Sequence, residues 1–112
     1  MIEKRVIDYL SEQFQIPVYA EVPKDKPSQF LTVARTGRAV IDHIQQANIA
    51  VQAWSSISLY DAADLCNEVE TIMSNFVADN SIAKCSLENS YNFTDISTKT
   101  YRYQAVFNIV YY

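Results

Sequence analysis

Alternating apolar and polar residues in the middle of the chain predict a strand followed by a long helix. In residues 48–54, Ile49, Val51 and Ala53 fall on one side and Trp54 on the other, the two-residue period of a half-buried strand. Further on, apolar residues recur at steps of three and four, as on one face of a helix. This apolar stripe consists of Ala62, Leu65, Cys66, Val69, Ile72, Met73 and Phe76. We expect both elements to face one core.

The start and end of this helix are also marked in the sequence. Ser58 is followed three positions later by Asp61, which is typical of a helix start in which the hydroxyl accepts a backbone N–H and the carboxylate faces the positive helix end. Residues 79–81, Asp-Asn-Ser, should follow its end. A connection of a few residues therefore leads from the strand to the helix.

The first third of the chain predicts one helix and two strands. In residues 2–14, apolar side chains repeat every four positions, and Pro17 ends this amphipathic helix. Residues 18–22 are extended and bounded by prolines, which favours an edge strand. Residues 30–35 alternate as a strand with both faces partly covered.

The last third predicts an antiparallel hairpin with a turn at residues 94–98. In the first strand, residues 82–93, we expect one face to hold Ala83, Cys85, Leu87, Tyr91 and Phe93. In the second strand, residues 99–112, the apolar face should hold Tyr101, Tyr103, Ala105, Phe107, Ile109 and Tyr111. Arg102 and Gln104 then lie on a polar face, which is either exposed to water or part of an interface.

Gly37 is the only glycine in the sequence. We expect it at a position with positive φ, where a turn reverses the preceding strand. The ten residues 38–47 would then form either a long loop or a flexible hairpin arm leading to the next strand. Long excursions from a compact domain tend to carry contacts, so partner binding is predicted here.

Together these elements predict an α+β fold in a single domain covering residues 1–112. The sheet should have four to five strands, mostly antiparallel or mixed, with two helices packed on one face. The helix after the strand 48–54 is long enough to cross the sheet, so it could connect a neighbouring parallel pair through a right-handed crossover.

Composition and charge narrow the functional classes. The chain has 49% hydrophobic and 20% charged residues, as in a globular protein, and a formal net charge of -4. An acidic protein is poorly suited to coat nucleic acid, because that affinity depends on lysine and arginine. Neither an apolar leader nor a membrane-spanning run is apparent, so we expect synthesis and folding in a cytosol. Cys66 and Cys85 lack zinc-site spacing and should be reduced thiols.

Chemically reactive side chains are sparse. His43 follows Asp42, but adjacent side chains diverge on an extended backbone, so a catalytic pair is not expected. One glycine cannot build a phosphate-binding loop. We therefore predict no enzyme activity and no catalytic, metal or cofactor site. Arg35, Arg38 and Arg102 could bind a phosphate or carboxylate, or form ion pairs between subunits.

Four features in this order resemble the small bacteriophage tail-terminator and head–tail completion, or neck, proteins. They are the proline-bounded first strand, the strand ending in Arg35-Thr36-Gly37, the strand ending in Trp54 followed at once by a helix with Ala62-Ala63, and a terminal strand with Arg102-Tyr103-Gln104. The resemblance covers nearly the whole chain. Arg38 stands where such proteins often have a second glycine.

The resemblance implies a structural virion protein that forms a ring, commonly sixfold, on the end of the tail tube and joins tail to head. Its partners would be copies of itself, the tail tube protein and the head connector or neck proteins, with passive DNA passage and no membrane contact. It would occur in the virion, and in the host cytoplasm during assembly. The residues expected at interfaces are Arg35, Gly37, Arg38, Asp42, His43, Arg102 and Gln104.

Two alternatives remain open at this point. One is a neck or head-completion protein of the same fold, which works closer to the capsid. The other is a small-ligand-binding or enzymatic α+β domain that uses Arg38, Asp42 and His43.

Overall fold

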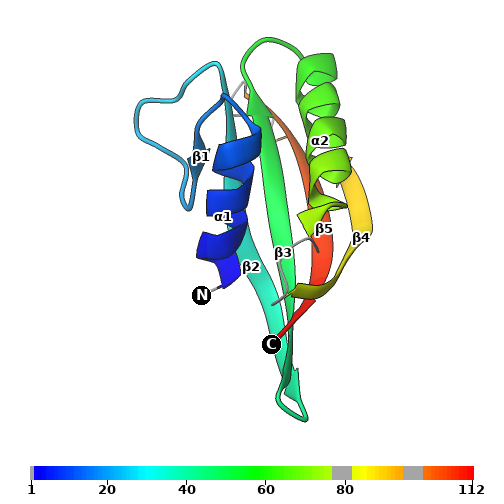
Figure 1. Ribbon diagram of the computed structural model, residues 1–112. Coiled ribbons are helices and arrows are strands. Elements are labelled where there is room, and N and C mark those ends of the chain that lie inside the picture. The colour runs from blue at the N-terminus through cyan, green and yellow to red at the C-terminus, as the bar shows by residue number, and fades with distance from the viewer. Residues whose placement is uncertain (1, 77–81, 95–99) are drawn as a thin grey trace.

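The computed structural model describes residues 2–76, 82–94 and 100–112, and within them the chain forms one sheet and two helices. The elements are α1 (Ile2–Gln13), β1 (Val18–Tyr19), β2 (Gln29–Ile41), β3 (Ile44–Ser55), α2 (Leu59–Met73), β4 (Ile82–Asn92) and β5 (Tyr101–Tyr111). The five strands are ordered β1-β2-β3-β5-β4, and both helices cover one face (Figure 1). The predicted α+β fold is confirmed.

The sheet is mixed, but its parallel pair is not the one suggested by the sequence. β1 pairs with β2 in parallel, with Val18 opposite Leu31, and every other neighbouring pair is antiparallel. β3 and β4, which α2 connects, run in the same direction but are separated by β5. The expectation of neighbouring parallel strands around the long helix is therefore wrong.

The core lies between the helices and the sheet, as the apolar periods predicted. β3 contributes Ala47, Ile49, Val51 and Ala53, all buried. The buried side chains packed against them are Val6 and Leu10 of α1, Leu65, Cys66, Val69 and Met73 of α2, and Ala105, Phe107 and Ile109 of β5. Removing this apolar surface from water is the main favourable term in folding. α2 ends at Met73, and Phe76 beyond it is still buried.

The start of α2 is fixed by a junction around Asp61. The Ser58 hydroxyl accepts the Asp61 N–H at 3.0 Å, so the predicted cap is confirmed. The Asp61 carboxylate accepts hydrogen bonds from Ser55 Oγ and Gln29 Nε2, both at 2.6 Å. One side chain thus joins the helix to the end of β3 and the start of β2.

Asp61 should make stability depend on pH in the acid range. The hydrogen bonds from Ser55 and Gln29 lower the pKa of its carboxyl below the ordinary value. Because the folded pKa is the lower one, this contribution is present above the unfolded pKa, about 4, and is lost as pH falls through the folded pKa. We expect Asp61→Asn to reduce the fall in unfolding free energy between neutral and acid pH. Urea denaturation at both pH values measures this.

Asp64→Asn is the matched control, because Asp64 is an exposed acid on the same helix. If Asp61→Asn and Asp64→Asn leave the same pH dependence as the unchanged protein, the junction does not contribute in this way.

The side-chain pattern of β4 differs from the prediction because the strand contains two irregularities. Its register against β5 shifts between Ile82 and Lys84 and again between Leu87 and Asn89. Each shift moves the alternation by one position. Cys85 therefore lies on the helix side, opposite Ile109, but Tyr91 lies on the other side, opposite Gln104.

Other predictions for β5, the end of α2 and the cysteines are confirmed in some parts and not in others. On β5, Ala105, Phe107, Ile109 and Tyr111 of the predicted apolar face are buried and Tyr103 packs against the core, whereas Tyr101 is exposed. α2 ends at Met73, so the helix end predicted near residues 79–81 is several residues too late; those residues and most of the predicted turn at 94–98 lie outside the described residues. Both cysteines are free; Cys66 is buried and Cys85 half-buried.

Candidate functional site

The segment after Gly37 is a hairpin arm, not a long loop. β2 continues through Gly37 to Ile41, and β3 begins at Ile44, so a two-residue turn connects them. The turn residues Asp42 and His43 have φ values of 49° and 68°, whereas Gly37 has no positive φ. Positive φ at both central residues is typical of tight hairpin turns. The predicted turn at Gly37 is therefore wrong, and the hairpin alternative is confirmed.

Gly37 occupies its position because a neighbouring side chain approaches closely. The strand register shifts between Arg35 and Gly37, which places Gly37 opposite Asn48. A Cβ on Gly37 would lie 3.2 Å from Asn48 Nδ2. Asn48 Oδ1 in turn accepts a hydrogen bond from Asn108 Nδ2 at 3.1 Å. Glycine at a bulge thus leaves room for an asparagine pair that joins β3 to β5.

The arm projects from one end of an elongated molecule. The principal dimensions are 44 × 25 × 24 Å, and Figure 1 shows the tip of the β2–β3 hairpin extending beyond the rest of the fold. β5 pairs with β3 only from Gln45 onward, so residues 41–44 at the tip lie beyond the end of β5. Val40 is 57% exposed and Ile44 39% exposed. Exposed β-branched side chains on a projecting hairpin are suited to burial against a partner.

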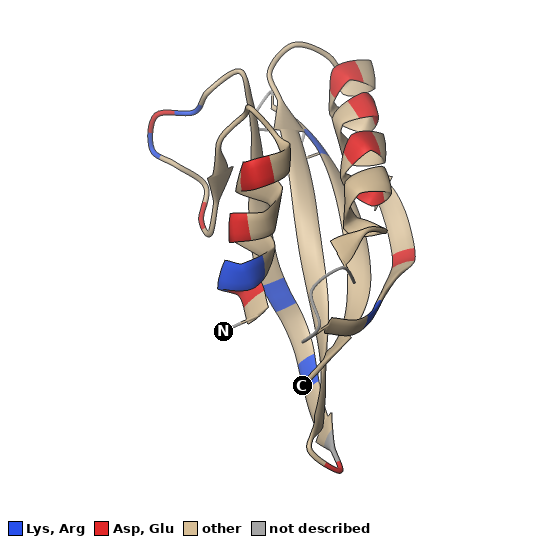
Figure 2. Ribbon diagram, viewed as in Figure 1, with Lys and Arg blue, Asp and Glu red and all other residues tan. Residues whose placement is uncertain are grey.

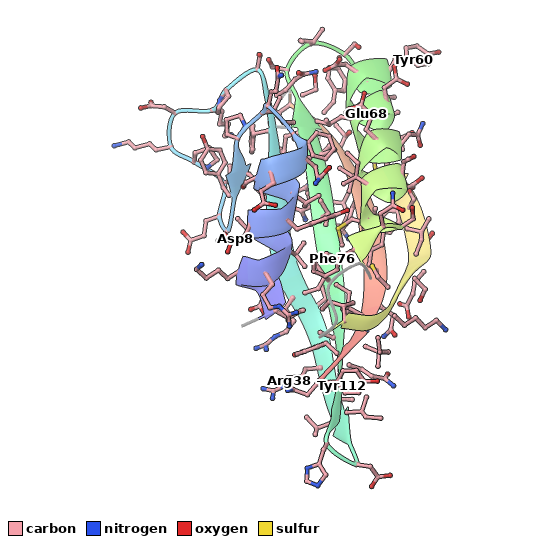
Figure 3. All side chains as sticks on the ribbon, viewed as in Figure 1. Asp8, Arg38, Tyr60, Glu68, Phe76 and Tyr112 are labelled. Carbon is pink, nitrogen blue, oxygen red and sulfur yellow. The ribbon has the colours of Figure 1, made fainter. Side chains whose placement is uncertain are left out.

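The base of the arm carries arginines on the side of the sheet that faces the helices. Arg35 pairs across the strands with Ile49 and Arg38 with Ala47, both core residues on that side. Figure 3 shows Arg38 and Tyr112 at this end of the molecule. A hollow of about 460 Å³ here is lined by Ile2, Arg5, Arg35, Arg38, Gln45, Tyr111 and Tyr112.

The two arginines of β2 have different neighbours at this base. Arg38 Nη2 donates to Gln45 Oε1 at 3.2 Å, and Arg35 Nη1 lies 3.9 Å from Glu3 Oε1. The hollow is thus lined by Arg5, Arg35 and Arg38, with Glu3 beside Arg35. An anionic group from a partner is therefore the chemistry that would complement it.

A second surface is the face of the sheet opposite the helices. A chain of hydrogen bonds crosses four strands there. Trp54 Nε1 donates to Thr32 Oγ1 at 2.9 Å, and Thr32 Oγ1 donates to Gln52 Oε1 at 2.9 Å. Gln52 Nε2 donates to Gln104 Oε1 at 2.7 Å, and Gln104 Nε2 donates to the Tyr91 hydroxyl at 2.6 Å. Each member thereby fixes the orientation of the next.

Aromatic rings extend this network toward the end of the sheet farthest from the arm. Phe30 and Trp54 stack with their ring centroids 5.4 Å apart, and Trp54 is only 6% exposed. The Arg102 guanidinium lies 4.6 Å from the Trp54 ring and 4.3 Å from the Phe93 ring. Its Nε also donates to the Phe93 carbonyl at 2.9 Å. Arg102, predicted as a group that binds an anion or a neighbouring subunit, is thus held between two rings of its own chain.

The predicted interface residues therefore separate into two groups. Arg35, Gly37, Arg38, Asp42 and His43 all lie on the hairpin arm, and the side chains of Asp42 and His43 are exposed at its tip.

Arg102 and Gln104 lie apart from the arm, in the hydrogen-bonded network of the open face. The sequence patterns did not single out Val40 and Ile44 on the arm. They also missed the network partners of Trp54, because these partners come from strands far apart in the sequence.

Among residues 2–76, 82–94 and 100–112, no group of three or more His, Cys, Asp or Glu side chains is placed to hold a metal ion. In the same part of the chain, neither helix has the length and apolar character needed to cross a membrane.

A scan against protein-family models and a search of curated protein sequences both find no match. The resemblance to tail-terminator proteins stays a prediction.

Proposed function

We propose that this protein is a structural subunit of a bacteriophage virion, a tail terminator that forms a ring on the end of the tail tube and joins the tail to the head. The sequence resemblance suggests this function. The observation that supports it best is the projecting arm, where Val40 and Ile44 expose apolar surface at the end of a 44 Å long molecule. A partner that covers the arm would remove this apolar surface from water, which favours binding.

Ring formation needs two different surfaces on each subunit, because each copy contacts its neighbours head to tail. The arm supplies one surface at one end of the molecule. The helices and the open sheet face lie elsewhere on the same subunit, so either is available to a neighbour (Figure 1). A subunit of this shape therefore suits a heterologous assembly.

The charge distribution is compatible with DNA passing through such a ring. The net charge is -4, and acidic side chains lie along both helices (Figure 2). Lysine and arginine contacts with phosphates supply most non-specific DNA affinity. An acidic ring would therefore leave DNA free to move.

The ligand-binding alternative receives less support from the arm. Asp42 and His43 are exposed turn residues, and Arg38 donates to Gln45 instead of to either of them. A reactive group needs partners that orient it, and these three residues do not form such a set.

The proposal is tested by the solution mass of the purified protein and by its binding to tail tubes of the same phage. Light scattering over a range of concentrations should show a closed oligomer, with a hexamer as the expected size, and electron microscopy should show the protein at tube ends. Failure to bind tube ends would contradict the proposal. Binding to the head connector without the tube would instead support the neck-protein alternative.

A further inference from the structure

A shallow, open groove on the helix-covered side has the composition to accept a protein segment. It lies between the C-terminal end of α1 and the outer side of α2, with a volume of about 580 Å³. Phe14 and Ile72 provide apolar surface, and both are only partly buried in the chain's own core. The remaining lining residues are Gln13, Gln15, Asn67, Glu68 and Thr71. The groove thus combines an apolar part with a polar rim.

The helix that borders this groove is acidic throughout. α2 contains Asp61, Asp64, Glu68 and Glu70 and has no lysine or arginine between Leu59 and Met73. Figure 2 shows these acids along the length of the helix, and Figure 3 labels Glu68 on it. Asp64 and Glu68 are exposed one helical turn apart. A basic partner is therefore favoured at this rim.

The helix side of the arm has the complementary character. Arg38 and Val40 lie on the same side of β2, because Arg38 pairs with Ala47 and Val40 with Gln45, which alternate with residues of the opposite face. Arg35 lies farther along this side. The arm therefore presents an exposed apolar side chain next to exposed basic ones.

We propose that the arm of one copy lies in the α1–α2 groove of the next copy. Val40 covers Phe14 and Ile72, and Arg38 faces Glu68 and Asp64. This contact specifies the subunit interface of the proposed ring, and it rests on that proposed function. The arm and the groove are different surfaces, so the contact is heterologous and repeats from copy to copy until a ring closes. Asp42 and His43, at the tip, extend past the paired charges.

Charge reversal on the two sides tests the contact. Arg38→Glu and Glu68→Lys should each weaken self-association at least about tenfold, because like charges replace an attractive pair. An equimolar mixture of the two variants should recover the oligomer, since each reversed arm then meets a reversed groove. Light scattering against protein concentration measures all three samples. Both residues are exposed, so circular dichroism should show unchanged folding.

Matched controls separate this contact from a general charge effect. Lys24→Glu and Glu88→Lys make the same charge changes at exposed positions outside the arm and groove and should leave the oligomer intact. Val40→Ser should weaken association, whereas Ile57→Ser, at a 63% exposed apolar residue near the other end of β3, should not.

Two kinds of result would overturn the contact. An oligomer that survives either reversal, or a mixture that associates no better than each variant alone, excludes the arm–groove pairing but leaves the ring open to another interface. A wild-type protein that is monomeric at every concentration also excludes it in solution. A separate result would reject the proposed function itself: the unchanged protein does not bind tail tubes.

Discussion

A protein with a shortened hairpin arm should stay folded and fail to join tails to heads. We expect this when residues 40–45 are replaced by Asn-Gly, which connects Ala39 directly to Gln46 through a two-residue turn. The change removes two residues from each strand, so every remaining side chain keeps its face of the sheet. Asn-Gly is the preferred sequence for such a turn. Val40 and Ile44, two large exposed apolar residues of the arm, are lost together.

The expected cost in stability is small beside the expected loss of function. The removed segment pairs with its own strands and, at Gln45, with Tyr111, and each hydrogen bond in such pairing is worth about 0.5–1.5 kcal/mol net. A fall of about 1–3 kcal/mol in the free energy of unfolding is therefore expected. Joining should be measured as infectious particles formed when purified protein is added to tails and heads that lack it, with the expected yield reduced at least a hundredfold.

The matched control keeps the arm at full length and changes only its turn. Asp42→Asn with His43→Gly places the same Asn-Gly pair at the native tip, where both residues already have positive φ. This variant should give a clearly higher particle yield than the shortened protein, because Val40 and Ile44 remain on the arm. Normal particle yield from the shortened protein would show that the arm is dispensable and would remove the main structural support for the proposed function.

Replacing Trp54 with alanine should have the largest effect on stability. Its ring stacks on Phe30 and carries the Arg102 guanidinium at 4.6 Å, and its Nε1 donates to Thr32. Since Trp54 is only 6% exposed, truncation leaves a cavity and also removes the donor at the start of the hydrogen-bond chain. Large aromatic residues truncated to alanine in cores cost about 3–5 kcal/mol. We expect a loss in this range in chemical denaturation.

Two further variants help to interpret this loss of stability: one keeps an aromatic ring at position 54, and the other is a control at an exposed aromatic residue. Trp54→Phe keeps an aromatic ring but removes the N–H, so it should cost about 1–2 kcal/mol, mainly from the unsatisfied Thr32 oxygen. Tyr60→Ala, at an 84% exposed aromatic residue, should change the unfolding free energy by less than about 0.5 kcal/mol. A loss below about 1 kcal/mol for Trp54→Ala would mean that the open face is poorly packed in solution.

The expected results assign different roles to two surfaces: the Trp54 network to stability and the hairpin arm to assembly. The network around Trp54 stabilises one end of the open sheet face within a single chain, because its members contact one another through hydrogen bonds and cation–π contacts. The arm at the other end has exposed side chains and few such bonds. Variants in the network should therefore act through stability, and variants in the arm through assembly.

The sequence by itself determined the elements that obey one regular period. The step of three and four in α2 placed Leu65, Val69 and Met73 in the core, and Ser58 capped the helix as predicted. The alternation on β5 correctly placed Phe107 and Ile109 inside. These patterns are readable because burial of one face imposes the same period over many consecutive residues. The fold class follows from them.

The tertiary structure alone decided the features that break a period or join distant strands. The register shifts in β4 turned Tyr91 to the open face, and the shift in β2 let the strand continue past Gly37 to a turn at Asp42 and His43. A bulge adds one residue without a distinctive sequence, so alternation cannot locate it.

The site residues show the same limit. Placing Arg102 between Trp54 and Phe93 required the pairing of β3, β4 and β5, which depends on contacts between residues far apart in the chain. The arm was anticipated as a binding segment, but its shape depended on where the turn formed. Local periodicity is set by burial along one element, whereas a site is set by which elements lie side by side, and packing of the whole domain decides that.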